Sequence, residues 1–193
     1  MAKRVFFSFH YQDVTDFRAN VVRQHWMTKP DRESAGFFDA SMWESAKKTG
    51  TTPVKRLINS GLDGTSVTCV LIGSQTYARA WVRYEILKSF RRGHSILAIH
   101  VNSIRGRDQT TKLAGPNPLH YVGVTFSASG ATGTLWELVS NHWQQYAEID
   151  GSASWETSVA AQYRGNGYNL GSWSPTYDWV ANDGYNNFAT WVG

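Results

Sequence analysis

Two continuous apolar segments limit the folds that this sequence can adopt. "SVTCVLIG" (residues 66–73) and "SILAIHV" (residues 95–101) are nearly unbroken runs of Val, Ile, Leu and small residues. Such runs are typical of central parallel strands, because helices cover both faces of a parallel sheet. Between them, residues 77–90 carry apolar side chains at helical spacing, with Val82 and Ile86 on one stripe. The order strand, helix, strand predicts a doubly wound α/β sheet.

The sequence before these segments also alternates between strand and helix patterns. The expected elements are a strand at 4–9, a helix at 13–26, a loop at 28–36, a strand at 37–41, a loop at 42–52 and a helix at 53–62. Because ligands of such sheets bind beyond the carboxyl ends of the strands, three segments are expected to converge on one crevice. They are "SFHYQD" after the first strand, "DASMW" after the second and "GSQTYARAW" after the third.

The pattern changes after about residue 125. The remaining residues are rich in Gly, Ser, Asn and aromatic side chains, and apolar and polar residues alternate around Ser140 and Asn141 as in a hairpin. The last residues are expected to close as a helical segment, and the aromatic residues to form a satellite core. We therefore divide the chain into an α/β domain at 1–125 and a C-terminal, aromatic-rich extension at 126–193 that packs on it.

Composition narrows the classes of function. Lys and Arg total 19 against 15 acidic residues, so the net charge of +4 is a mild excess without the basic stripe of nucleic-acid-binding proteins. No apolar stretch approaches the ~20 residues of a membrane span, and the basic N-terminus lacks the apolar length of a signal peptide. We expect a cytoplasmic protein that binds neither nucleic acid nor membrane. The single cysteine, Cys69, is expected to be a buried small hydrophobe.

Several common catalytic motifs are absent from the sequence. There is no G-x-G-x-x-G after the first strand and no G-x-x-x-x-G-K-[ST], which disfavours conventional Rossmann dehydrogenases and P-loop NTPases. Ser74, in "LIGSQT", does not sit in the G-x-S-x-G elbow of a hydrolase. The six histidines show neither H-E-x-x-H spacing nor cysteine partners, so we expect no metal site and no bound cofactor.

Trp81 and Glu85 form the most unusual pair in the sequence. They are four residues apart, so they share one face of the predicted helix. Trp81 lies roughly opposite the apolar stripe and Glu85 lies at its edge. An indole beside a carboxylate at the edge of a crevice suits a sugar or a nucleoside. In the alternative, structural interpretation, Glu85 forms a surface ion pair with Lys88 or Arg92, and Trp81 packs on the C-terminal extension.

Other candidates for binding a substrate lie at the strand ends and on the same helix. An acid such as Asp39 is suited to ribose hydroxyls, and Arg83, with Arg79, is suited to a pyrophosphate. Each candidate also has an ordinary interpretation, as a strand-end residue, a turn former or an exposed helix residue. The candidates are Ser8, Phe9 and His10 after the first strand, Asp39 and Trp43 after the second, Ser74 after the third, and Arg83 and Tyr84 on the helix.

Two separated segments resemble parts of Toll/interleukin-1 receptor (TIR) domains. "CVLIGSQTYARAWVRYEILKS" is similar to their third strand, loop and helix, and Trp81 through Glu85 matches their W-x-x-x-E motif. "RVFFSFHYQD" resembles their first strand and the loop after it. The likeness is greatest to the TIR-like proteins of the bacterial Thoeris anti-phage system and runs the length of the chain. "DASMWESAKKTGTTPVKR" departs from the usual BB loop of TIR domains.

This resemblance implies a flavodoxin-like, mostly parallel sheet and an enzyme that uses NAD as its substrate. The implied reaction cleaves the nicotinamide–ribose bond and cyclises the product to an isomer of cyclic ADP-ribose, with Glu85 as the catalytic glutamate and Trp81 as the motif tryptophan. The resemblance also implies a separate effector protein activated by the product, and a phage-derived trigger and self-association are compatible with it. Two other classes stay open from the residues: a TIR-like assembly module without catalysis, and a nucleoside hydrolase or transferase.

Overall fold

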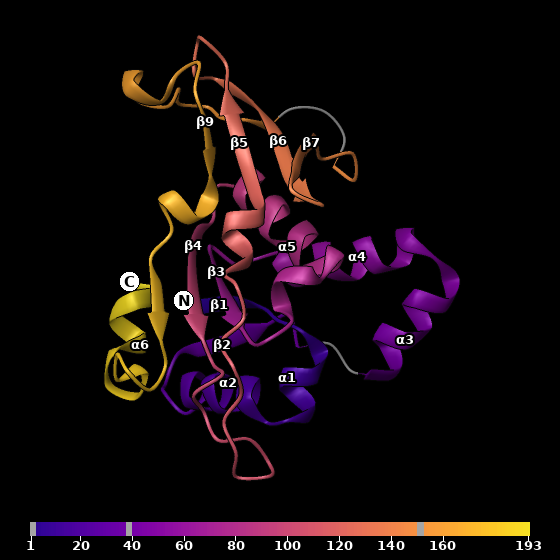
Figure 1. Cartoon of the computed structure of the whole chain (residues 1–193), viewed down its shortest axis with the longest axis vertical. Coiled ribbons are helices and arrows are strands. Elements are labelled where there is room, and N and C mark those ends of the chain that lie inside the picture. The colour runs from indigo at the N-terminus through magenta and orange to yellow at the C-terminus, as the bar shows by residue number, and fades with distance from the viewer. Residues whose placement is uncertain (1–2, 38–39, 150–152) are drawn as a thin grey trace.

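A parallel sheet of five strands lies at the centre of the computed structural model, which describes residues 3–37, 40–149 and 153–193 (Figure 1). All four pairings between neighbouring strands are parallel. In spatial order the strands are β2 (Arg32–Ala35), β1 (Lys3–Ser8), β3 (Val67–Ile72), β4 (Ser95–His100) and β10 (Thr176–Asp178). The order 2-1-3-4 is that of flavodoxin-like folds, so the predicted doubly wound α/β class is confirmed.

Alternate residues of β3 point into two separate cores, one on each face of the sheet. Cys69 and Leu71 pack with α2 and α6, whereas Val70 and Ile72 pack with α4 and α5. Every residue of β3 is buried, which explains its unbroken apolar run. The helices are α1 (Tyr11–Thr15), α2 (Arg18–Met27), α3 (Ala40–Thr49), α4 (Thr51–Leu62), α5 (Ala80–Arg91) and α6 (Gly184–Val192). In the described part of the chain, none of these helices has the length and apolar character needed to cross a membrane.

A second, antiparallel sheet follows in the chain. Its order is β7-β6-β5-β9, and β8 pairs with β6. The hairpin predicted at Ser140 and Asn141 is confirmed, and both residues have positive φ, as its tight turn requires. β5 spans the boundary predicted after residue 125, and the division into two domains stays a prediction. The strands are β5 (Val122–Phe126), β6 (Thr132–Val139), β7 (His142–Gln145), β8 (Ala153–Ser154) and β9 (Gly167–Asn169), and the 3-10 turns are η1 (Thr76–Ala78), η2 (Pro118–Tyr121), η3 (Ala161–Tyr163) and η4 (Leu170–Ser172).

Helix α5 lies between the two sheets (Figure 1). It contacts β1, β3 and β4 of the parallel sheet, and also β5 and η2 of the second region. Val124 and Leu135 of the second sheet therefore belong to the same core as Val82 and Ile86 of α5. Because α5 is covered from two directions, its buried surface is wider than the apolar stripe, and Glu85 lies within it.

The C-terminal region returns to the parallel sheet. β10 forms the edge of that sheet beside β4, and α6 confirms the predicted terminal helical segment. Phe188 of α6 packs against Trp26 of α2 with ring centroids 5.3 Å apart, and Tyr177 stacks on Trp191 at 4.1 Å. Other aromatic residues of the extension gather around Phe126 of the second sheet. The extension thus supplies a strand to the central sheet as well as packing on it.

The position predicted for the second strand was wrong. β2 lies at Arg32–Ala35, inside the segment expected as a loop, and pairs with β1 alone. An edge strand tolerates polar residues, so "RESA" carries no apolar signal. Of the residues predicted as strand, Phe37 instead packs on the Phe7 ring, 38–39 lie outside the described residues, and the rest begin α3.

The predictions for segments 42–52 and 13–26 also need correction. Most of the segment 42–52, expected as a loop, belongs to α3, which packs against α4. Tertiary contact of this kind commonly overrides a weak local pattern. The single helix expected at 13–26 is instead two helices, because the left-handed φ of 68° at Phe17 separates α1 from α2.

Candidate active site

A pocket of about 230 Å³ opens where β1 and β2 end and α5 begins. Segments after the first and third strands converge there, as the crevice argument predicts for a parallel sheet. Glycine is required at one point of its wall: Gly36 has a φ of 87°, and a Cβ there would come within 2.1 Å of the Phe7 carbonyl oxygen. The described lining residues are Phe7, Phe9, His10, Tyr11, Gly36, Lys47, Arg79, Trp81, Val82 and Glu85.

Glu85 is the one carboxyl group among the described lining residues, and Ser8 donates a hydrogen bond to it. The Ser8 hydroxyl donates a hydrogen bond of 2.5 Å to Oε2 of Glu85, and both side chains are buried, with Glu85 6% exposed. Burial raises the pKa of Glu85 to about 8, while the hydrogen bond from Ser8 acts in the lowering direction. Glu85 has no ion pair with any described residue, and Arg92 pairs with Asp63 at 2.9 Å. The structural interpretation of Glu85 as a surface ion-pair partner is therefore wrong.

A second set of buried hydroxyl groups fixes the backbone of α5 at Glu85. The Ser89 hydroxyl donates to the carbonyl oxygen of Glu85 at 2.7 Å. Thr68 of β3 donates in turn to the Ser89 hydroxyl at 2.8 Å. These bonds anchor the helix to the central strand without touching the carboxyl group itself.

Aromatic rings form much of the pocket wall. Phe9 lines the pocket at the end of β1, and the Phe37 ring packs against it with centroids 4.4 Å apart. Trp81 lines the pocket from α5 and packs edge-to-face on Tyr84 at 6.0 Å. A wall of this kind excludes water and offers flat surfaces to a planar or sugar-like ligand.

Three basic side chains are among the described residues that line the same pocket. His10, Lys47 and Arg79 belong to the lining residues. Burial lowers the pKa of His10, and the nearby charges of Arg79 and Lys112 lower this pKa further. His10 therefore remains a neutral imidazole at pH 7. Among the residues that the structure describes, no three His, Cys, Asp or Glu side chains come together as a metal site.

Ser8 meets the pocket only through its bond to Glu85, and three other described sequence candidates do not line the pocket. Arg83 forms an ion pair with Glu137 of β6, with Nε and Oε2 2.9 Å apart. The buried Tyr84 hydroxyl accepts a hydrogen bond of 3.3 Å from Asn59 of α4. Ser74 follows β3 and lies outside the lining residues. Arg83 thus ties α5 to the second sheet, and Tyr84 faces α4.

Two further candidates fall at the edge of what the structure describes. Asp39 lies outside the described residues. Trp43 belongs to α3 instead of the expected loop, and its side chain is likewise outside the described part. Both assignments stay predictions.

The structure brings together Ser8, Phe9, His10, Trp81 and Glu85 from the sequence candidates. It also adds lining residues that were not among those candidates, Gly36 and Lys47 among them. No sequence pattern pointed to Lys47, because its segment was expected to be a loop. Gly36 could be placed in the site only if the end of β2 were known.

A flavodoxin-like parallel sheet, with an indole and a buried glutamate one turn apart on the helix after its central strand, defines a TIR-like α/β domain. The family described as "Thoeris protein ThsB, TIR-like domain" matches residues 6–105. "Putative cyclic ADP-D-ribose synthase ThsB1" from Bacillus cereus (strain MSX-D12) is 53% identical over 194 residues, which cover 100% of both chains. The chain belongs to the ThsB family of TIR-like Thoeris proteins.

Proposed function

We propose that this protein consumes NAD: it cleaves the nicotinamide–ribose bond and cyclises the product to an isomer of cyclic ADP-ribose. The name of the Bacillus cereus relative, a cyclic ADP-D-ribose synthase, supports this activity, and the ThsB family supports a role in anti-phage defence. The observation that carries the proposal is the buried Glu85 carboxyl, held by Ser8 and lining a pocket with Trp81.

A single carboxyl group is enough for this bond cleavage. Ordinary glycosidases use two, because one must protonate the leaving oxygen. Nicotinamide in NAD is a cationic leaving group and departs as a neutral molecule without an acid. Positive charge then builds on the ribose, and the Glu85 carboxylate stabilises that charge.

The pKa of Glu85 fits a group that meets a cation. With its pKa at about 8, the carboxyl of the free protein is mostly protonated at pH 7. A pyridinium ring, and then a charged ribose, favours the ionised form when placed beside it. Substrate binding therefore displaces the Glu85 proton to solvent and leaves the carboxylate beside the ribose.

Cyclisation requires that a nucleophile of the substrate itself reaches the ribose before water does. The aromatic wall of Phe9, Tyr11 and Trp81 serves to exclude water from this step. Holding the two reacting ends of one molecule close together supplies the remaining advantage.

The cellular context follows from the same proposal. The cyclic product activates a separate effector protein, and phage infection supplies the trigger for synthesis. The protein acts in the cytoplasm, and self-association is compatible with this role.

The test uses lysates of cells that express the protein, taken before and during phage infection and supplied with NAD. Nicotinamide release and cyclic product are measured by mass spectrometry for the wild type, Glu85→Gln and the surface control Glu156→Gln. We expect Glu85→Gln to lower the rate by about 10²- to 10³-fold and the control to leave it unchanged. If Glu85→Gln makes as much cyclic product as the wild type, Glu85 has no catalytic role. If the wild type releases no nicotinamide during infection, the proposed NAD-consuming activity is rejected.

A further inference from the structure

The acidic and basic groups of the pocket lie at different depths. Glu85 is buried, whereas the side chains of Arg79 and Lys47 are exposed and line the same pocket. A ligand that fits this arrangement carries positive charge at its inner end and negative charge at its outer end.

Arg79 is an uncommitted cation of this site. Its guanidinium makes no hydrogen bond or ion pair with any residue in 3–37, 40–149 or 153–193, although its charge acts in the direction of lowering the pKa of both His10 and Asp13. Arg83, one turn further along α5, is held by Glu137. The two arginines are thus equivalent in sequence pattern, but only Arg83 has an ion-pair partner among the described residues.

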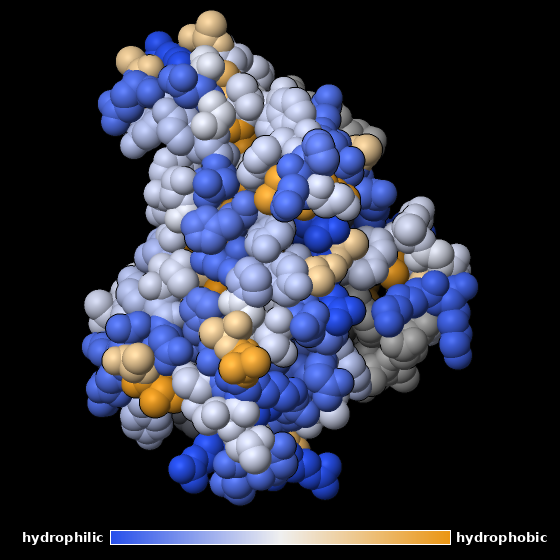
Figure 2. Space-filling view, viewed as in Figure 1, coloured by the Kyte–Doolittle hydropathy of each residue, from blue (hydrophilic) through white to orange (hydrophobic). Residues whose placement is uncertain are grey.

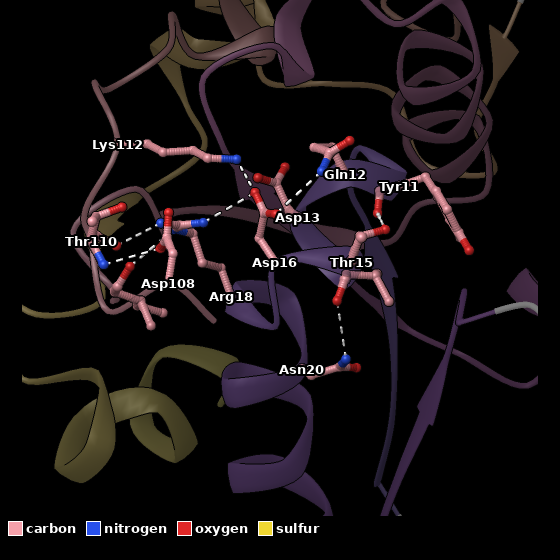
Figure 3. Close-up of polar contacts among 12 residues, drawn as sticks. Tyr11, Gln12, Asp13, Thr15, Asp16, Arg18, Asn20, Asp108, Thr110 and Lys112 are labelled. Atoms are coloured by element: carbon pink, nitrogen blue, oxygen red, sulfur yellow. Dashed lines mark hydrogen bonds and ion pairs between the residues drawn. The ribbon is translucent and has the colours of Figure 1, made fainter. Parts of the chain in front are cut away.

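Another nearby cation, Lys112, is already committed. Figure 3 shows Lys112 directed at Asp16, with which it forms an ion pair. Arg18, 1% exposed, also pairs with Asp16 and donates to the carbonyl oxygens of Ile104 at 3.0 Å and Thr110 at 2.7 Å. These contacts fasten the segment after β4 to the start of α2, so Lys112 serves the fold.

We propose that Arg79 binds the pyrophosphate of a dinucleotide substrate and so fixes the direction in which the substrate enters. This inference rests on the proposed function, because it takes NAD as the ligand. The nicotinamide ribose then lies inward beside Glu85, and the pyrophosphate lies at the mouth. A guanidinium presents paired N–H groups that match two phosphate oxygens. The reverse direction would bring the pyrophosphate beside Glu85, where burial already disfavours negative charge.

The dimensions of the pocket agree with this direction. Its volume of about 230 Å³ is below the roughly 300–1,000 Å³ of sites that enclose a whole drug-sized ligand. The pocket therefore takes one end of a dinucleotide and leaves the pyrophosphate at the rim. There the neutral imidazole of His10 adds a hydrogen-bonding group without adding charge.

The test measures binding in the Glu85→Gln background, so that no turnover interferes. NAD and nicotinamide riboside, which lacks the pyrophosphate, are titrated by calorimetry. We expect Arg79→Ala to weaken NAD binding about 10- to 100-fold, the usual loss for a charge-assisted hydrogen bond, and to leave nicotinamide riboside within about twofold. Arg79→Lys is expected to retain part of the affinity, because it keeps the charge but not the paired donors.

The matched control is Arg92→Ala, which removes one positive charge at the far end of α5. If Arg79→Ala and Arg92→Ala weaken NAD binding equally, or if Arg79→Ala weakens both ligands equally, the pyrophosphate role is overturned. The result is independent of catalysis. A wild type that binds NAD through Arg79 but never consumes it would retain this inference and reject the proposed function, whereas full turnover with an unchanged KM in Arg79→Ala would do the reverse.

Discussion

Ser8 and Glu85 are 77 residues apart in the chain, yet the Ser8 hydroxyl lies 2.5 Å from Oε2 of Glu85. The contact joins the end of β1 to α5 and is buried on both sides. A hydroxyl donor stabilises the charged carboxylate, so it opposes the burial that raises the pKa of Glu85 to about 8. The pair therefore sets the pH at which this carboxyl ionises.

Removing the Ser8 hydroxyl should move that pH upward. In Ser8→Ala the carboxylate loses its donor, so we expect the pKa of Glu85 to rise by about one unit or more. The rate constant kcat/KM at pH 7 should fall roughly tenfold and recover at higher pH, because this constant reports the pKa values of the free enzyme. The measurement is kcat/KM for NAD between pH 6 and 10.

The matched control for this experiment is Ser89→Ala. Ser89 donates to the backbone carbonyl of Glu85 and leaves its carboxyl group untouched. Its loss is expected to lower stability without moving the midpoint of the pH profile. An unmoved midpoint in Ser8→Ala as well would show that Ser8 does not tune Glu85.

Replacing Glu85 should stabilise the protein at alkaline pH. The folded-state pKa of about 8 is above the unfolded value, so the folded state holds a proton that the unfolded state has released between about pH 4.5 and 8. Wild-type stability therefore falls as pH rises through this window. Glu85→Gln has no such loss, and its advantage at pH 9 should reach a few kcal/mol. Urea unfolding of both proteins at pH 5, 7 and 9 measures this, and an advantage independent of pH would contradict it.

The pair Arg83 and Glu137 should matter for stability and not for substrate binding. Their ion pair is mostly buried, and it joins α5 to β6. Arg83→Ala leaves Glu137 without its partner, which should cost on the order of 1–3 kcal/mol. The KM for NAD should stay within about twofold. A large rise in KM with an unchanged free energy of unfolding would show that Arg83 binds the substrate.

Trp81 should influence which product forms. In Trp81→Ala the pocket loses a large part of its aromatic wall, so water is expected to compete with cyclisation and the fraction of linear ADP-ribose to rise. Trp81→Phe keeps an aromatic surface and should keep mostly cyclic product. The measurement is the ratio of cyclic to linear product at equal NAD consumption. An unchanged ratio in Trp81→Ala would show that other residues exclude water.

The central part of the fold could be predicted because its signals are local. β3 and β4 are covered on both faces, and their apolar runs indicate this directly. β2 could not be found, because an edge strand with polar residues has no such run. α3 could not be predicted either, because contact with α4 supports this helix and a local sequence pattern does not reveal such a contact.

The candidate site was predictable to the same extent. The spacing of Trp81 and Glu85, and their place after the central strand, are readable from the sequence. The burial of Glu85 is not, because it arises from the second sheet, which covers α5 from the other side. Nor could the sequence separate Arg79 from Arg83, since the partner of Arg83 lies 54 residues away.

The most direct measurement is a crystal structure of the Glu85→Gln protein soaked with NAD. We expect the nicotinamide ribose to contact residue 85 and the Ser8 hydroxyl to remain bonded to the side chain of that residue. NAD bound with its nicotinamide ribose away from residue 85, or bound only outside the pocket, would contradict the catalytic role of Glu85.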